Sequence, residues 1–238
     1  MASKFLIVIF AIFNISALAQ KPVKMDKEKG WVSLFDGHTT KGWRGAYNTE
    51  FPKHGWVVKD GELRGELTEG AESGDAGDIV TLKKYRNFEF VFEWKIGNGG
   101  NSGVKYFIEE RLPKPAKGSQ AGYEYQLIDD ADYIYMDKKL PQDLKTASIY
   151  DVIPADKPDV TMNVWHLSKI VVNNNHIEHW LDGKKVLAVN RGDETFRNGV
   201  ADSKYKDYIG FDRIPDGHIL LQDHGHSVAF KNIKIKEL

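Results

Sequence analysis

The sequence contains no cysteine, and this absence excludes several kinds of chemistry. No disulfide, thiolate nucleophile or lipid-modified cysteine is available, so the hydrophobic core must stabilise the fold. An excess of charge of either sign is also missing, because 33 basic residues stand against 34 acidic ones. The resulting net charge of −1 creates no field that would attract nucleic acid or anionic lipid. We therefore expect no nucleic-acid partner and favour a neutral ligand.

Long hydrophobic runs are scarce as well. The apolar run Phe5–Ile15 is shorter than the roughly 20 residues of a transmembrane helix. Lys4 precedes this run and the small residues Ala17–Ala19 follow it, which is the pattern of a secretory signal peptide. We expect residues 1–19 to be a signal peptide, and the mature protein to be exported to the periplasm or the extracellular space without a membrane anchor.

The remaining chain alternates short strand-like segments with turn signals such as Asp60-Gly61 and Asp182-Gly183. This pattern favours one all-β domain, a sandwich or jelly roll, over residues 30–238 after a polar lead at 20–29. One short helix is expected over residues 193–203. The expected strands are 31–35, 56–58, 62–65, 79–82, 88–96, 103–108, 123–128, 148–152, 165–172, 176–181, 184–189, 218–222 and 228–235, the last with a bend near Asn232.

Two segments in the middle of the chain carry polar groups on strands. In residues 88–95 the period of two directs the aromatic side chains to one face and Glu93 and Lys95 to the other. That second face is either solvated, with a weak cross-strand pair, or lines a concave sheet surface. Lys105 alternates with Phe107 in the next segment, so we place its ammonium on the same surface as Glu93.

Glycines surround Asn101 and Ser102 in the run GGNSGVK. Glycine permits a positive φ or a close approach of the backbone to a ligand, although a tight hairpin with a bulge explains the run equally well. In the run GYEYQLIDD, Glu124 and Gln126 point the same way, about 6 to 7 Å apart along the strand. Such a separation suits two hydroxyls of one sugar ring.

Acidic residues follow Gln126 without completing a familiar motif. Glu-x-Gln-x-x-Asp is similar to the Glu-x-Asp-x-x-Glu strand of retaining β-sandwich glycosidases, which need two carboxylates roughly 5 Å apart. Gln126 cannot ionise, so the sequence gives little support to a two-carboxylate mechanism. The cluster Asp129, Asp130 and Asp132 offers oxygen ligands for calcium, but a solvated acidic loop is the favoured interpretation.

Histidines stand at two informative places. His176 and His179 lie on opposite faces of one expected strand, and His179 is expected to be a hydrogen-bonded histidine of the core or of a site wall. His224 belongs to a polar cluster with Gln222 and Asp223, between two expected strands near the end of the chain. Functional residues tend to collect at strand ends, so His224 is a candidate site residue.

Four segments together resemble the 3-keto-disaccharide hydrolase domain family. They are GWVSLFDGHTTKGWRG at 30–45, FEWKIGNGGNSGVKYFIEE at 92–110, GYEYQLIDD at 122–130 and HILLQDHGHSVAFKNIKIKEL at 218–238. The resemblance spans essentially the whole mature chain, in order. It implies an exported, concanavalin A-like jelly-roll β-sandwich of two antiparallel sheets with one short helix.

The resemblance also implies an activity, the cleavage of glycosides already oxidised to a ketone at C3. A C3 ketone acidifies the C2 proton, so a base can form an enolate that expels the C1 aglycone, after which water adds. The substrate would be a small carbohydrate, and a base, an enolate stabiliser and a proton donor would be required.

The matching segments and the parity of side chains along the strands suggest roles for individual residues. Glu124 or His224 would be the general base, and the other would be a proton donor or substrate anchor. Other residues would bind or line the site: Asn101, Lys105 and Gln126 would hold the ketone and hydroxyls, and Glu93 and Lys95 would line the same face. No cofactor is certain, and a divalent cation that polarises the ketone is an alternative to Lys105.

Two other functions remain open from the sequence. The same sandwich would also suit a carbohydrate-binding module that binds glycans without turning them over. An ordinary β-sandwich glycoside hydrolase is the other alternative, and it would cleave glycosides that carry no ketone.

Overall fold

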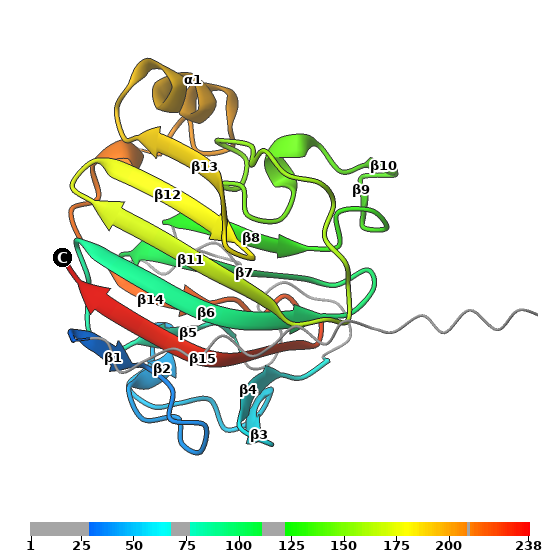
Figure 1. Cartoon of the computed structure of the whole chain (residues 1–238), viewed down its shortest axis with the longest axis vertical. Helices are drawn as coiled ribbons and strands as arrows, with labels where there is room; N and C mark the ends of the chain where they lie inside the picture. The colour runs from blue at the N-terminus through cyan, green and yellow to red at the C-terminus, as the bar shows by residue number, and fades with distance from the viewer. Residues whose placement is uncertain (1–28, 68–76, 111–121, 209) are drawn as a thin grey trace, which may run out of the picture.

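Two antiparallel β-sheets packed face to face form the computed structural model, which describes residues 29–67, 77–110, 122–208 and 210–238 (Figure 1). The eight-stranded sheet has the order β13-β12-β11-β6-β15-β4-β3, with β1 also paired to β15. The five-stranded sheet has the order β2-β5-β14-β7-β8, and β9 and β10 form a separate hairpin. This architecture confirms the expected β-sandwich of antiparallel sheets.

The strands and the helices occur along the described chain in the following order. The strands are β1 (Trp31–Ser33), β2 (Trp43–Gly45), β3 (Trp56–Lys59), β4 (Glu62–Gly65), β5 (Ile79–Thr81), β6 (Phe88–Ile96), β7 (Asn101–Ile108), β8 (Tyr123–Ile128), β9 (Ile134–Tyr135), β10 (Lys138–Lys139), β11 (His166–Asn173), β12 (His176–Leu181), β13 (Lys184–Asn190), β14 (His218–Leu221) and β15 (Val228–Glu237). The helix is α1 (Glu194–Asp202), and two 3-10 turns span Gln142–Leu144 and Phe211–Arg213.

Strands with clear alternation lie where the sequence predicts them, and the helix does too. The predicted bounds of β4, β6, β8 and β12 match the structure. Asp193 caps α1 by accepting a hydrogen bond from the Phe196 backbone N–H at 2.8 Å. The helix lies beside the edge strand β13 (Figure 1). The predicted bend near Asn232 is confirmed, because Asn232 has φ +51° and the pairing of β15 with β6 shifts register between Lys231 and Lys234.

Two sequence expectations about strands differ from the structure, and a third expectation is not tested by it. The predicted strand at 148–152 is wrong: Ala147 and Asp151 adopt positive φ, so the chain turns, and Ile149 forms only isolated bridges. The short strands β2, β9 and β10 were not predicted, because two or three residues carry no periodicity. The expected signal peptide at 1–19 lies outside the described residues. In the described part of the chain, no helix is long and apolar enough to cross a membrane.

A bulge in β7 overturns one expected face. Phe107 has φ +60°, and the pairing of β7 with β14 shifts register between His218 and Leu220. As a result Tyr106 and Phe107 both enter the core cluster, although they are consecutive. Lys105 and Phe107 therefore do not share a face, contrary to the sequence-based expectation.

Aromatic side chains fill the space between the sheets, and their polar atoms are paired. Trp94 Nε1–H donates to Ser168 Oγ at 2.8 Å. His179 is completely buried; its Nδ1–H donates to the Ala147 carbonyl at 2.7 Å and its Nε2 lies 3.0 Å from the Tyr106 hydroxyl. His179 is thus the expected core histidine, and burial lowers its pKa to about 4.

Acid should destabilise the fold through His179. The folded chain protonates His179 near pH 4 and the unfolded chain near pH 6.5, so the unfolded state holds more protons between these values. The free energy of unfolding should therefore fall as the pH drops through this window. Relative to His179→Gln, we expect the native protein to lose on the order of 3 kcal/mol, at about 1.4 kcal/mol per pH unit. Urea unfolding at several pH values measures this, and parallel curves for the two proteins would contradict it.

Candidate functional site

A row of polar residues crosses the face of the five-stranded sheet that points away from the core. On β7, Val104 belongs to the core, so alternation directs Gly103 and Lys105 to the opposite face. Register pairs Lys105 with Glu124 and Gly103 with Gln126 across β7 and β8. Glu124 and Gln126 consequently lie on the same side, which confirms the parity prediction.

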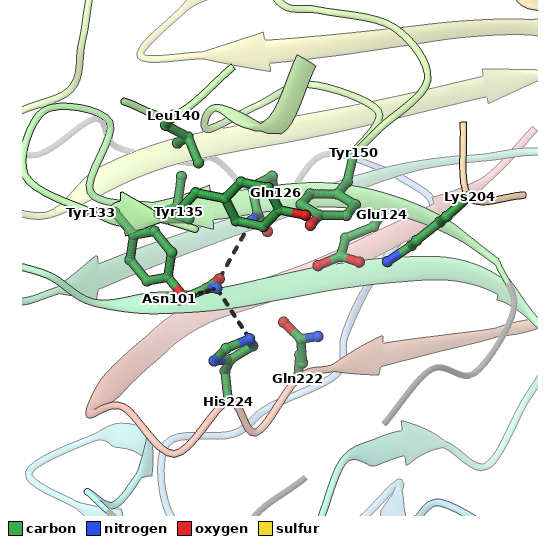
Figure 2. Close-up of a pocket in the computed structure, with 11 residues that line it drawn as sticks. Asn101, Glu124, Gln126, Tyr133, Tyr135, Leu140, Tyr150, Lys204, Gln222 and His224 are labelled. Atoms are coloured by element: carbon green, nitrogen blue, oxygen red, sulfur yellow. Dashed lines mark hydrogen bonds between the residues drawn. The ribbon is translucent and has the colours of Figure 1, made fainter. Parts of the chain in front are cut away.

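Glu124 and Gln126 lie on the floor of a pocket of about 240 Å³ (Figure 2). Segments outside the sheet form its walls. Tyr133, Tyr135 and Leu140 come from the region around the β9–β10 hairpin, and Lys204 follows α1. The complete lining is Asn101, Glu124, Gln126, Ile128, Tyr133, Tyr135, Leu140, Tyr150, Lys204, Gln222 and His224.

Glu124 is held by a buried ion pair. Its Oε2 lies 3.3 Å from Lys105 Nζ, and the two side chains are only 4% and 2% exposed. The pocket lining includes Glu124 but not Lys105. The expectation that Lys105 contacts a ligand directly therefore needs correction, because its ammonium lies against Glu124 beneath the pocket surface.

Asn101 connects the floor of the pocket to two of its walls. Its Nδ2 lies 3.1 Å from His224 Nε2 and donates to the Tyr133 hydroxyl at 3.3 Å, while its Oδ1 accepts from Gln126 Nε2 at 3.4 Å (Figure 2). An amide nitrogen only donates, so in this arrangement His224 Nε2 accepts and carries no proton. The structure thus brings together Asn101, Gln126 and His224, as the sequence predicted.

Asp78 is a charged neighbour that the sequence analysis missed. It immediately precedes β5, and its Oδ1 accepts a hydrogen bond from the Asp223 backbone N–H at 2.9 Å. Burial raises the pKa of Asp78 to about 7; Lys105 opposes the rise, whereas Asp223 and Glu124 add to it. Asp78 thus interacts electrostatically with the buried residues Lys105, Glu124 and Asp223. In the sequence, Asp78 is indistinguishable from an ordinary turn residue before a strand.

Other missed residues come from segments without periodicity. Lys204 enters the pocket from the turn after α1, and its Nζ lies 4.4 Å from the centroid of the Tyr150 ring. Gln222 lies in the polar cluster with His224, but the sequence predicts no role for its side chain. Only the spatial arrangement identifies these residues, because no motif joins positions 150, 204 and 222.

Glu93 and Lys95 do not belong to the pocket. They lie on β6, in the eight-stranded sheet, and point away from the core on the other side of the sandwich. Asn232 Nδ2 donates to Glu93 Oε1 at 2.7 Å, and Lys95 Nζ lies 4.8 Å from the Trp165 ring centroid. Their outward direction was predicted correctly, but the sheet that carries them was wrong.

The acidic residues after β8 have structural partners. Asp129 Oδ2 accepts from the Gly99 backbone N–H at 2.8 Å, and Asp130 accepts from the Thr146 backbone N–H at 2.7 Å and pairs with Lys157. In the described residues, no three histidine, aspartate or glutamate side chains converge as a metal site would require. The donor set therefore does not fit the expected alternatives of a calcium site or a divalent cation held by such groups.

Comparisons with known proteins give consistent results. Residues 30–236 match the family described as 3-keto-alpha-glucoside-1,2-lyase-like domains. A 3-keto-disaccharide hydrolase of Bacteroides thetaiotaomicron is 32% identical over 241 residues, which cover 92% of this chain and 81% of the relative. The crystal structure of a candidate glycosyl hydrolase from Parabacteroides distasonis has a TM-score of 0.76 and 31% identity, covering 88% and 94% of the two chains. A second such structure from the same species has a TM-score of 0.67 and 27% identity, covering 87% and 99%.

The buried carboxyl of Asp78 should destabilise the fold at alkaline pH. Its pKa is about 7 in the folded chain against 3.8 as the ordinary value, so the folded state holds more protons in between. The associated stability is complete below about pH 3.8 and is lost as the pH rises through 7. Asp78→Asn keeps an oxygen acceptor for the Asp223 N–H but does not titrate.

We therefore expect the unfolding free energy of Asp78→Asn to gain on the native protein by on the order of 2 kcal/mol between pH 5 and pH 8. Chemical denaturation at both pH values measures the difference. If Asp78→Asn does not gain stability relative to the native protein between the two pH values, the raised pKa of Asp78 is contradicted.

Proposed function

Because the chain belongs to the family of 3-keto-alpha-glucoside-1,2-lyase-like domains, we propose that it is a glycosidase-type hydrolase that acts on 3-keto-glycosides or 3-keto-disaccharides. The observation that carries this proposal is the single carboxylate, Glu124, in a small polar pocket. At about 240 Å³ the pocket is below the roughly 300 to 1,000 Å³ of drug-sized sites, which suits a single sugar ring.

The reaction proceeds in three balanced steps. A base removes the C2 proton, and the electron pair moves into the C3 ketone to give an enolate. The enolate re-forms the ketone as a C1=C2 double bond develops and the aglycone leaves with its oxygen, which takes up a proton. Water then adds across the double bond, with hydroxide at C1 and a proton at C2. The products are a 3-keto sugar and the free aglycone alcohol.

Glu124 is the general base in this proposal. Lys105 Nζ lies 3.3 Å from Oε2 of this carboxylate, and Oε1 is the oxygen that lies toward Gly103. His224 is a weaker choice, because its Nε2 already accepts a hydrogen bond from the Asn101 amide in this arrangement. His224 is instead a substrate anchor, so both Glu124 and His224 act in the site.

Cationic and amide groups stabilise the charge that develops on the substrate. Lys204 brings an ammonium to the pocket wall near Glu124 (Figure 2), where it can stabilise the negative charge on the enolate oxygen. Gln126 and Asn101 present amide groups along the floor for the ketone and the hydroxyls. Gln126 and Asn101 are held by the sheet and by a hydrogen bond to each other, which favours electrostatic stabilisation in the transition state.

The same pocket argues against an ordinary two-carboxylate glycosidase. Among the described residues that line it, Glu124 is the one acidic side chain. Retaining and inverting mechanisms require a second carboxyl group on the scissile bond, within about 5 to 10 Å of the first. A carbohydrate-binding module would use the floor amides, but it has no need for an ion pair beneath its ligand.

We also propose export, on the basis of the signal-like residues 1–19.

Turnover of matched substrates tests the proposed function. The purified protein should release the aglycone from a 3-keto-glucoside at least 100-fold faster than from the same glucoside without the ketone, because only the ketone acidifies the C2 proton. Comparable rates would favour the ordinary glycosidase. Binding of either sugar without turnover would favour the binding module.

Two glutamate variants test the assigned base. Glu124→Gln should lower kcat at least 100-fold, in line with the typical contribution of general-base catalysis, because an amide cannot accept the proton. Glu93→Gln is the matched control, since Glu93 lies on the opposite sheet and should leave kcat unchanged. Equal effects of the two substitutions would contradict the assignment. Melting temperatures show that both variants fold.

A further inference from the structure

The side-chain oxygen of Gln222 has no hydrogen-bond partner in the described residues although it is buried. The residue is 3% exposed, and its Oε1 makes no hydrogen bond in the described part of the chain. Its backbone, in contrast, is fixed on both sides: its N–H donates to the Gly103 carbonyl at 2.9 Å and its carbonyl accepts from Ser102 Oγ at 2.9 Å. A buried acceptor without a partner is costly in an empty pocket, and a ligand donor would remove that cost.

Gly103 leaves a notch beside this amide. A Cβ atom on Gly103 would lie 2.4 Å from Glu124 Oε1 and 3.1 Å from Gln222 Oε1. The φ angle of Gly103 is not positive, so the space above it, rather than the backbone, requires glycine here. Two oxygen acceptors, one from β8 and one from the residue that follows β14, therefore border one small space above β7, and Figure 2 shows both side chains on that side of the sheet.

We propose that this notch, formed by Gly103, Glu124 and Gln222, binds the C2 carbon of the sugar. Glu124 Oε1 receives the C2 hydrogen, and Gln222 Oε1 accepts the hydrogen bond of the 2-hydroxyl. Two acceptors that converge on one point suit a carbon that carries both a C–H and an O–H. This inference rests on the proposed function and narrows its substrate class to 3-keto-glycosides with a free 2-hydroxyl.

The alternative role of Gln222 is purely local. If the amide were turned over, its NH₂ group would face Glu124 and would only position the carboxylate, without reading the substrate. A positioning role lowers activity on every substrate alike. A role in recognition lowers activity only on substrates that have the 2-hydroxyl.

The test compares a 3-keto-glucoside with its 2-deoxy analogue. The readout is the ratio of kcat/KM for the two substrates, because the intrinsic effect of the 2-hydroxyl on C2 acidity is the same for every variant. Gln222→Met preserves the length of the side chain and removes its acceptor. We expect the ratio to fall at least tenfold in this variant, through loss on the 2-hydroxy substrate alone.

Two further variants complete the design. Gln126→Met removes a different amide of the pocket floor and should lower kcat/KM on both substrates without changing the ratio. Gln222→Asn withdraws the carbonyl by one carbon and should lower the ratio as Gln222→Met does, which covers the case in which one variant fails to fold.

If a folded Gln222 variant has the same kcat/KM ratio as the native protein, the proposed binding of the 2-hydroxyl by Gln222 is contradicted, whatever happens to the overall rate. The proposed function would be unaffected by this result. No turnover of the 2-hydroxy substrate by the native protein would instead contradict the proposed function and the notch with it. The two failures are therefore distinguishable.

Discussion

The buried ion pair between Lys105 and Glu124 is the interaction on which the arrangement of the site depends. Removing two charges from water costs more than their attraction alone returns, so such a pair is poorly explained by stability. Its position is set by the pairing of β7 with β8, which places the two residues opposite each other. Gly103, one alternation away on β7, leaves room for the carboxylate to extend over the sheet.

Segments outside the five-stranded sheet form the walls of the pocket above Glu124. Ile128, Leu140 and Leu144 form a small apolar cluster outside the main core, and it fixes the chain that carries the tyrosine wall. The acceptor atoms of Asp129 and Asp130 hold the ends of the same region. Acidic residues that could be mistaken for ligands are therefore structural, and Glu124 remains the carboxylate that faces the cavity.

Alternation in the sequence predicts most of the longer strands and, where no bulge intervenes, the direction of the side chains along them. The predicted bounds of β6 and β8 match, and Glu124 and Gln126 point the same way because a strand has a period of two. Periodicity does not reveal which sheet a strand joins, which is why Glu93 and Lys95 were placed in the wrong surface. Periodicity also does not predict the bulge at Phe107, where one added residue reverses the faces to which the following side chains point.

Residues from non-periodic segments were beyond the reach of the sequence. Asp78 and Lys204 reach the site from a strand end and from the turn after a helix, and neither position carries a motif. Their contribution is electrostatic and depends on distances that only the folded chain defines. The family resemblance directed attention to the correct strands, whereas the roles of individual residues required the geometry.

A primary deuterium isotope effect at C2 is the most direct test of the central claim that Glu124 removes the C2 proton before the aglycone leaves. The substrate is a 3-keto-glycoside with a good leaving group, so that proton removal limits the rate, prepared with hydrogen or deuterium at C2. The account predicts a kcat/KM several-fold lower for the deuterated substrate with the native protein. A ratio of one, with rapid release of the aglycone, would contradict it and would indicate cleavage without C2 proton abstraction.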